Sequence, residues 1–412
     1  MLYLVEDSTP QPAQFGALPA LLARILDADL MYLAASVDAR FDEARFPDAY
    51  QHVTVDGRLV ASGLVWRTRT GEHDAVEVRD ADALAETLHL RGRGRDVVLA
   101  VPSRETFDAL RARTDLPLRA WHVEREDDGD AARIVEDTDR GTAVIMAAQR
   151  DRFGRWFDSS GTPRVEHRRV LQVAFVARAA EQQEQYPATL AALGDAADAL
   201  SVELNLRFVA PQDLSRGNAA SRLDGVHGIL LPGGADMTRV AGQIEAARFG
   251  WQTSIPVVGL CLGMQSMATA IARLALNAED IGLMEAQPDA RIASFIPIGV
   301  AGDGTLLHRL GERVVVPLRD SRVAQLLGER TRIHCNHRYR LNPELEAPLA
   351  TLGVTVSARD ESGAIADAIE AAVHPFFAGM QGHPELASRF DHPHPLLTGF
   401  LDAVAERSGT NR

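Results

Sequence analysis

Residues 255–274 read Ile-Pro-Val-Val-Gly-Leu-Cys-Leu-Gly-Met-Gln-Ser-Met-Ala-Thr-Ala-Ile-Ala-Arg-Leu, and this stretch decides the fold. Its apolar start predicts a strand, and its second half, from Met264 to Leu274, predicts a helix. The pattern Gly-Leu-Cys-Leu-Gly at 259–263 lies between them and is typical of a sharp turn that presents a nucleophile. Partial positive charge at a helix N-terminus would stabilise negative charge on the Cys261 sulfur. The same residues also fit a buried cysteine in an ordinary strand-to-helix turn.

Composition limits the class of protein. The 412 residues are enough for two or three domains, and a hydrophobic content of 46% is enough for real cores. A formal net charge of −14 argues against nonspecific nucleic-acid binding. The only cysteines, Cys261 and Cys335, exclude a disulfide framework and fit a reducing cytosol, so we expect a cytoplasmic protein. The N-terminus lacks a signal-peptide pattern and no stretch has the length of a membrane span, so we expect no membrane association.

All 43 basic residues are arginine, and the sequence contains no lysine. Codon bias in a GC-rich genome accounts for this composition, but its chemical consequence stands. The chain cannot form a Schiff base on a lysine side chain, and it cannot supply the lysine of a phosphate-binding P-loop.

Residues 1–150 predict a smaller N-terminal α/β domain. We expect helices near 18–26, 81–90 and 104–113, a hairpin at 51–67, and strands at 2–5, 30–35, 96–101 and 142–147. The charged stretch 124–139 predicts a solvated loop and helix. Nothing in this half predicts chemistry.

Residues 151–170 include a turn-rich polar segment and are expected to form a linker. Residues 171–408 then predict a second α/β domain, with a helix at 188–200 and strands at 171–176, 202–209, 228–231, around 257, 332–335, 354–358, 364–369 and 376–380. Repeated strand–helix units imply a mostly parallel open sheet flanked by helices, with its site at the carboxyl ends of the strands.

Three features converge on that edge of the predicted sheet. The first is Cys261, and the second is Pro232-Gly233-Gly234, which directly follows a strand and allows a backbone N–H to approach a substrate. The third is His383-Pro384-Glu385, in which a histidine can hold the cysteine proton and a carboxylate can orient the histidine. We expect Pro384 to keep that segment extended, so that His383 and Glu385 point the same way. A plain glycine turn and a surface loop are the alternative readings.

Residues from about 168 to 408 resemble a class I glutamine amidotransferase domain, and most closely the glutaminase domain of CTP synthase. The resemblance rests on Pro232-Gly233-Gly234, on residues 255–265, on 337–342, on 374–377 with 381–385, and on 395–400. It covers a little over half of the chain, and the N-terminal domain remains unrecognised.

The resemblance implies a role for each matching residue. Cys261 would be the nucleophile, His383 the acid and base, and Glu385 the orienting partner of the histidine. The backbone N–H groups of Gly233 and Leu262 would form an oxyanion hole. The remaining matches, which would bind glutamine, are Gly234, Gln265, Glu285 and Arg338. A zwitterionic substrate needs an anion for its ammonium group and a guanidinium for its carboxylate.

The sequence departs from CTP synthase in three places. Ala235 and Asp236 stand where that family carries an aromatic residue and another glycine, and Gly382 replaces an aromatic residue before His383. The N-terminal half is shorter than a synthetase domain and has no P-loop and no lysine. We therefore do not expect a true CTP synthase.

A zinc site is a competing interpretation. His334, Cys335 and His337 lie close in sequence, and His392 and His394 follow later. The spacing fits none of the usual zinc patterns, so we predict no metal site.

The leading hypothesis is an enzyme that hydrolyses glutamine through a thioester on Cys261 and delivers ammonia to an unidentified small-molecule acceptor. That acceptor would bind the N-terminal domain or a partner synthase, and ATP and Mg²⁺ would be needed only if the acceptor must be activated. The sequence leaves self-association open. The alternative hypothesis is a use of the fold without amide transfer, for glutamine sensing or for hydrolysis of another amide.

Overall fold

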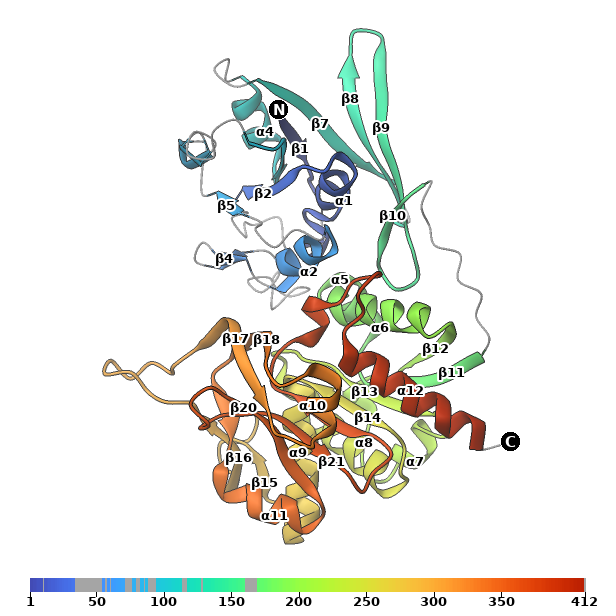
Figure 1. The fold of residues 1–412 in the computed structure, drawn as a ribbon, viewed down its shortest axis with the longest axis vertical. Helices are drawn as coiled ribbons and strands as arrows, with labels where there is room; N and C mark the ends of the chain where they lie inside the picture. The colour runs from blue at the N-terminus through green and yellow to red at the C-terminus, as the bar shows by residue number, and fades with distance from the viewer. Residues whose placement is uncertain are drawn as a thin grey trace. The chain divides into compact units, whose positions relative to one another are not determined.

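The computed structural model describes residues 1–9, 11–33, 54–55, 58–59, 61–70, 76–78, 82–84, 86–87, 94–112, 117–126, 129–159 and 169–410. The chain divides into two compact units. The first is Met1–Val165 with Ala180–Leu193, and the second is Glu166–Ala179 with Gly194–Arg412. Each unit has α/β architecture (Figure 1).

The first unit is built on an eight-stranded sheet in the order β10-β9-β8-β7-β1-β6-β2-β5. Strands β7, β1, β6, β2 and β5 are parallel, and β7 to β10 form an antiparallel meander. The strands are β1 (Leu2–Glu6), β2 (Asp29–Leu33), β5 (Val76–Val78), β6 (Val97–Val101), β7 (Leu118–Arg125), β8 (Ala131–Thr138), β9 (Gly141–Arg150) and β10 (Trp156–Asp158). Among the described residues, the helices of this part are α1 (Ala17–Leu26), α2 (Ala61–Thr70) and α4 (Arg104–Arg111).

Two predictions for this unit need correction. The stretch 124–139 is not a loop and helix, because it supplies the end of β7 and all of β8, with Ile134 and Val135 buried. The predicted hairpin at 51–67 is shorter: β3 (Thr54–Val55) pairs with β4 (Arg58–Leu59), and α2 follows at once. Its turn at Asp56-Gly57 lies outside the described residues.

Of the predicted linker, residues 156–158 form β10, residues 169–170 begin β11, and residues 160–168 lie outside the described residues.

The second unit is built on a nine-stranded sheet in the order β12-β11-β13-β14-β22-β21-β20-β17-β18. Its strands are β11 (Arg169–Phe175), β12 (Val202–Phe208), β13 (Gly228–Leu231), β14 (Val257–Leu260), β17 (Arg309–Pro317), β18 (Thr331–His337), β20 (Val354–Asp360), β21 (Ala366–Ala371) and β22 (Phe377–Met380). Only the five strands from β12 to β22 are parallel, and the other pairs are antiparallel. The connections at 361–365 and 372–376 are too short for parallel crossovers, which explains why the sheet is less parallel than predicted.

Helices cover both faces of the parallel strands. A Cβ at Gly228 in β13 would meet Val404 of α12 (Pro395–Thr410), whereas Gly259 in β14 faces Met267 of α9 (Leu262–Leu276). Figure 1 labels α8 (Val240–Gln252) beside α9 in this unit. The other helices of the second half are α5 (Ala179–Glu184), α6 (Pro187–Ala199), α7 (Ala219–Arg222), α10 (Arg322–Leu327) and α11 (Glu346–Thr351). A small second sheet contains β15 (Ile281–Leu283), β16 (Ile292–Pro297) and β19 (Tyr339–Leu341).

Within the described part of the chain, no helix combines the length and the apolar character needed to cross a bilayer.

Candidate active site

Cys261 occupies a strained turn between β14 and α9. Its φ of 50° and ψ of −107° are rare for a residue with a side chain, and such strain persists only where packing imposes it. The flanking glycines permit that packing. A Cβ at Gly263 would lie 2.0 Å from the carbonyl oxygen of Leu231, and a Cβ at Gly259 would lie 2.7 Å from the carbonyl carbon of Gly263. The turn is therefore the sharp elbow that the sequence predicts.

His383 and Glu385 follow β22, the strand that pairs with β14. The Nδ1 atom of His383 is 2.7 Å from Oε1 of the buried Glu385. The backbone N–H of His383 donates to the carbonyl oxygen of His334 at 2.8 Å. The expected reason for this pairing is wrong, because Pro384 begins a 3-10 helix (Pro384–Ala387) and the segment is not extended. Burial lowers the pKa of His383, but the Glu385 carboxylate and the Cys261 sulfur raise it well above its ordinary value.

The Pro232-Gly233-Gly234 turn packs directly against both groups. A Cβ at Gly233 would lie 3.2 Å from Cε1 of His383 and 3.3 Å from Cβ of Cys261. Gly234 has a φ of 153°, and its α-carbon faces the buried guanidinium of Arg239. A side chain at Gly233 would fill the space beside the cysteine, and one at Gly234 would collide with Arg239. The fold thus brings Gly233, Cys261 and His383 together from the ends of three adjacent strands.

Two buried amide side chains form a chain of hydrogen bonds that ends at Cys261. Gln265, in the first turns of α9, donates from Nε2 to Oε1 of Gln381 at 3.4 Å. Gln381 in turn donates from Nε2 toward the Cys261 sulfur at 3.9 Å, and its backbone N–H donates to the carbonyl of Asp367 at 2.8 Å. Sequence reasoning assigned Gln381 no role. The available signal was its place at the end of β22, two residues before His383.

Glu285 and Arg338 come from the small sheet, one after β15 and the other before β19. Both side chains are exposed. Shielding from water raises the pKa of Glu285, and the positive charge of Arg338 opposes that rise, so the two groups interact. The predicted anion and cation for an amino acid therefore lie close enough for their charges to interact. Leu262, the other predicted backbone donor, is the first residue of α9 and is buried.

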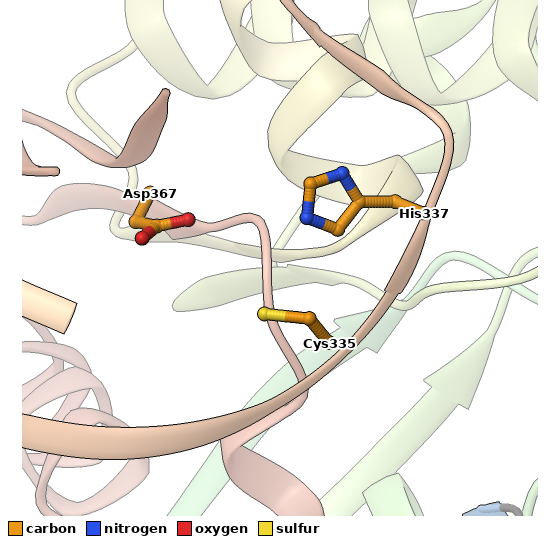
Figure 2. Close-up of side chains that lie close together, drawn as sticks. All are labelled: Cys335, His337 and Asp367. Atoms are coloured by element: carbon orange, nitrogen blue, oxygen red, sulfur yellow. The ribbon is translucent and has the colours of Figure 1, made fainter. Parts of the chain in front are cut away.

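A buried cluster of potential metal ligands lies in β18 and β21 (Figure 2). The ligand atoms of Cys335, His337 and Asp367 lie within 4.8 Å of one another. Arg309 already pairs with Asp367, through Nη1 to Oδ1 and through Nη2 to Oδ2 at 2.9 Å, and its Nη1 lies 3.3 Å from His337 Nε2. A guanidinium therefore stands where a cation would have to bind.

The protonation of that cluster follows from its burial. Burial raises the pKa of the Cys335 thiol to about 12 and lowers the pKa of His337 to about 3. His337 Nδ1 donates to the carbonyl of Tyr339 at 2.8 Å, which leaves Nε2 as the acceptor for Arg309. His394, named in the zinc alternative, instead accepts from the Leu396 N–H at the start of α12. We describe the cluster as a buried ion pair with a neutral histidine and a neutral thiol.

Comparison with known proteins identifies the second unit. The family model for glutamine amidotransferase class-I matches residues 196–403, just over half of the chain. A CTP synthase of Herpetosiphon aurantiacus is 28% identical over 394 residues, covering 92% of this chain and 71% of the relative. A CTP synthase of Brucella canis is 29% identical over 383 residues, covering 87% and 68%.

A solved structure gives the same result. The glutaminase domain of Trypanosoma brucei CTPS with bound acivicin has a TM-score of 0.54 and 25% sequence identity, and the match covers 57% of this chain and 94% of that chain. The sequence alignments leave only about a tenth of this chain unmatched, so they extend into the first unit, which the family model does not reach. The chain belongs to the class I glutamine amidotransferase family.

Proposed function

We propose that this chain hydrolyses glutamine through a γ-glutamyl thioester on Cys261. The observation that carries the proposal is the contact of Gly233, Cys261 and His383 at one sheet edge, with His383 bonded to Glu385. Nucleophile, base and orienting group in this order constitute the arrangement that activates a thiol. His383 uses Nδ1 for Glu385, so Nε2 is the nitrogen that serves the cysteine.

The proposed reaction has two halves. The Cys261 thiolate attacks the side-chain amide carbon of glutamine, and the carbonyl oxygen takes up the negative charge. His383 gives its Nε2 proton to the leaving nitrogen, the carbon–nitrogen bond breaks, and ammonia departs. His383 then takes a proton from water, whose oxygen attacks the thioester. Glutamate leaves, and the proton remains on His383 beside the regenerated thiolate.

The proposed supporting roles follow the sequence expectations. The N–H groups of Gly233 and Leu262 stabilise the oxyanion, since Gly233 contacts Cys261 and Leu262 directly follows it. Gln265 is connected to Cys261 by two hydrogen bonds, one to Gln381 and one from Gln381 to the sulfur. Gly234 leaves room for the substrate, Arg338 binds its carboxylate, and Glu285 binds its ammonium group. Glutamine would thus pair with Arg338 at one end and with Glu285 at the other.

We further propose that the ammonia goes to a small-molecule acceptor other than UTP. The alignment covers 71% of the Herpetosiphon CTP synthase, so more than a quarter of that relative lies outside it. The sequence also has no lysine to hold a nucleoside triphosphate. The acceptor would bind the first unit or a partner synthase, with ATP and Mg²⁺ only if the acceptor must be activated.

Labelling with a glutamine-mimicking diazo ketone tests the proposal. An adduct on Cys261, together with glutamate release from glutamine, would support it. A folded protein that neither reacts nor releases glutamate would favour the alternative, a glutamine-sensing or other amide-hydrolysing use of the fold. Amide-nitrogen-labelled glutamine added to cell extract would then identify the acceptor through a labelled product.

A further inference from the structure

Gln243 is a fully buried polar residue on α8 that the proposed reaction does not use. Its Nε2 donates to the carbonyl oxygen of Pro232 at 3.0 Å. Its Oε1 accepts a hydrogen bond from the Ser266 hydroxyl, also at 3.0 Å. Burying an amide costs free energy unless both of its ends are bonded, and here each end has a partner. The two partners belong to the glycine turn after β13 and to the elbow helix α9.

The bond to Pro232 acts on Gly233 because the two residues share one peptide group. A peptide unit is planar, and in its trans form the C=O and the N–H point in opposite directions. The described residues contain no cis peptide bond. Holding the Pro232 oxygen toward α8 therefore turns the Gly233 N–H away from α8. In the described part of the chain, this N–H donates to no carbonyl or side chain, so it is available to a ligand.

The hydrogen bond from Gln243 matters because glycine residues by themselves do not fix the orientation of this peptide group. Two consecutive glycines, Gly233 and Gly234, restrict the backbone less than any other pair of residues. Rotation of the Pro232–Gly233 peptide would replace an N–H donor with a carbonyl oxygen and would repel a developing negative charge. Ser266 lies four residues after Leu262, one turn along the same side of α9. Gln243 thus connects the segments that carry both proposed oxyanion donors.

We infer that Gln243 is a positioning residue that fixes the Gly233 N–H toward the reacting carbonyl, held in turn by Ser266. This inference rests on the proposed glutamine hydrolysis. Neither bond is visible from the sequence, where Gln243 reads as one polar residue of a helix.

The test compares an oxyanion-dependent reaction with an independent one in the purified protein. Glutamine hydrolysis needs the oxyanion hole, whereas alkylation of Cys261 by iodoacetamide attacks a saturated carbon and forms no oxyanion. Gln243→Met keeps the volume and removes both bonds. We expect kcat to fall by about tenfold to a hundredfold, somewhat less than the usual loss of an oxyanion donor, with KM and the alkylation rate changed by less than about twofold.

Ser266→Ala and Ser294→Ala form a matched pair. Both serines are fully buried, but Ser294 bonds to Thr269 at 2.7 Å and not to the glycine turn. We expect Ser266→Ala to lower kcat by about threefold to tenfold and Ser294→Ala to leave kcat nearly unchanged. The two variants should lower the melting temperature by similar amounts, because each removes one buried hydroxyl. This pair decides the question even if Gln243→Met fails to fold.

Two results would overturn the inference. A Ser266→Ala protein whose kcat matches that of Ser294→Ala would show that the bonds are only structural. A parallel loss of alkylation would place the effect on the thiol instead of the oxyanion. If the wild type released no glutamate, the proposed function itself would fail, and the inference would fail with it.

Discussion

Cys261 has an unusual backbone conformation, and the packing of its neighbours holds it there. We predict that Cys261→Ser lowers glutamine hydrolysis by at least about a thousandfold, because a hydroxyl is a far weaker nucleophile than a thiolate. Glutamate release measures the loss, and circular dichroism should show an unchanged fold. Near wild-type activity in this variant would remove Cys261 from the mechanism. Cys335→Ala serves as the control and should retain its activity.

The two cysteines should also differ in reactivity. The Cys335 thiol is fully buried and its pKa is raised to about 12, so it remains protonated at pH 8. We predict that iodoacetamide adds one carbamidomethyl group to the folded protein at that pH and none to Cys261→Ser. Intact-protein mass spectrometry counts the adducts. Modification of Cys335 in the folded protein would contradict the burial described here.

Arg338 is exposed, and its charge acts on Glu285. We predict that Arg338→Lys raises KM for glutamine by about tenfold with little change in kcat, because an ammonium group cannot form the bidentate pair of a guanidinium with a carboxylate. Steady-state kinetics of glutamate release provide the measurement. If KM stays at its wild-type value, Arg338 has only a structural role.

At the scale of elements, Gly382 shows how the strands position the histidine. A Cβ there would lie 2.1 Å from Cγ2 of Ile333 and 3.1 Å from the carbonyl oxygen of His334, which accepts the His383 N–H. The resemblance places an aromatic residue at this position. The glycine therefore allows β18 to lie close against the segment that carries His383.

We predict that Gly382→Phe lowers kcat by about tenfold or more and also lowers the melting temperature, because β18 must shift away from His383. Adding Ile333→Ala should restore part of both values. Gly302→Phe is the matched control, since nothing lies within 4 Å of a Cβ at that glycine. Equal effects at residues 382 and 302 would show that the close packing of β18 does not matter.

Short buried strands and the elbow were predictable from the sequence because each carries a local signal. The apolar run before Cys261 and the helical pattern after it correspond to β14 and α9. The strand β8 was missed because it carries several charged residues and because a register shift buries two successive residues, Ile134 and Val135, which breaks the period of two. The antiparallel half of the second sheet was missed because pairing direction depends on loop lengths that uncertain strand ends obscure.

The polar residues behind the site could not be predicted. Gln243, Gln381 and Arg309 are buried only because partners from distant parts of the chain satisfy them. Their partners are separated from them by 11 to 120 residues, and a single sequence gives no register for such contacts.

Across the whole protein, buried histidines make the free energy of unfolding depend on pH. Burial lowers the pKa of His337 to about 3 and that of His394 to about 4. The unfolded chain binds these protons near pH 6.5, so the stabilisation is complete above that pH and is lost as pH falls toward 3. We predict that His337→Asn flattens the fall in the free energy of unfolding between pH 7 and pH 4. Urea titrations of both proteins provide the comparison, and identical slopes would contradict the assignment.

The relatives named CTP synthase suggest both glutamine hydrolysis and CTP synthesis, and we expect the whole protein to perform only the first. With glutamine, UTP, ATP and Mg²⁺, we predict that glutamate forms at a basal rate and that CTP does not. The missing lysines leave only arginines and helix N-termini to bind phosphate. Chromatography of nucleotides and an assay for glutamate in one reaction give both values. CTP that accumulates in step with glutamate would sink the proposal of a different acceptor.

The strand order of the second sheet also sets a sequence in time. Strands β14 and β22 are neighbours, yet 120 residues separate Cys261 from Gln381. During synthesis the nucleophile is therefore made well before β22 and before His383, the proposed base that follows this strand. Pairing between strands so distant in the sequence is slow, because closing the long loop costs entropy before the contacts form. We therefore expect a chain in which β22 has not yet paired with β14 to release no glutamate from glutamine, because His383 and Glu385 follow that strand.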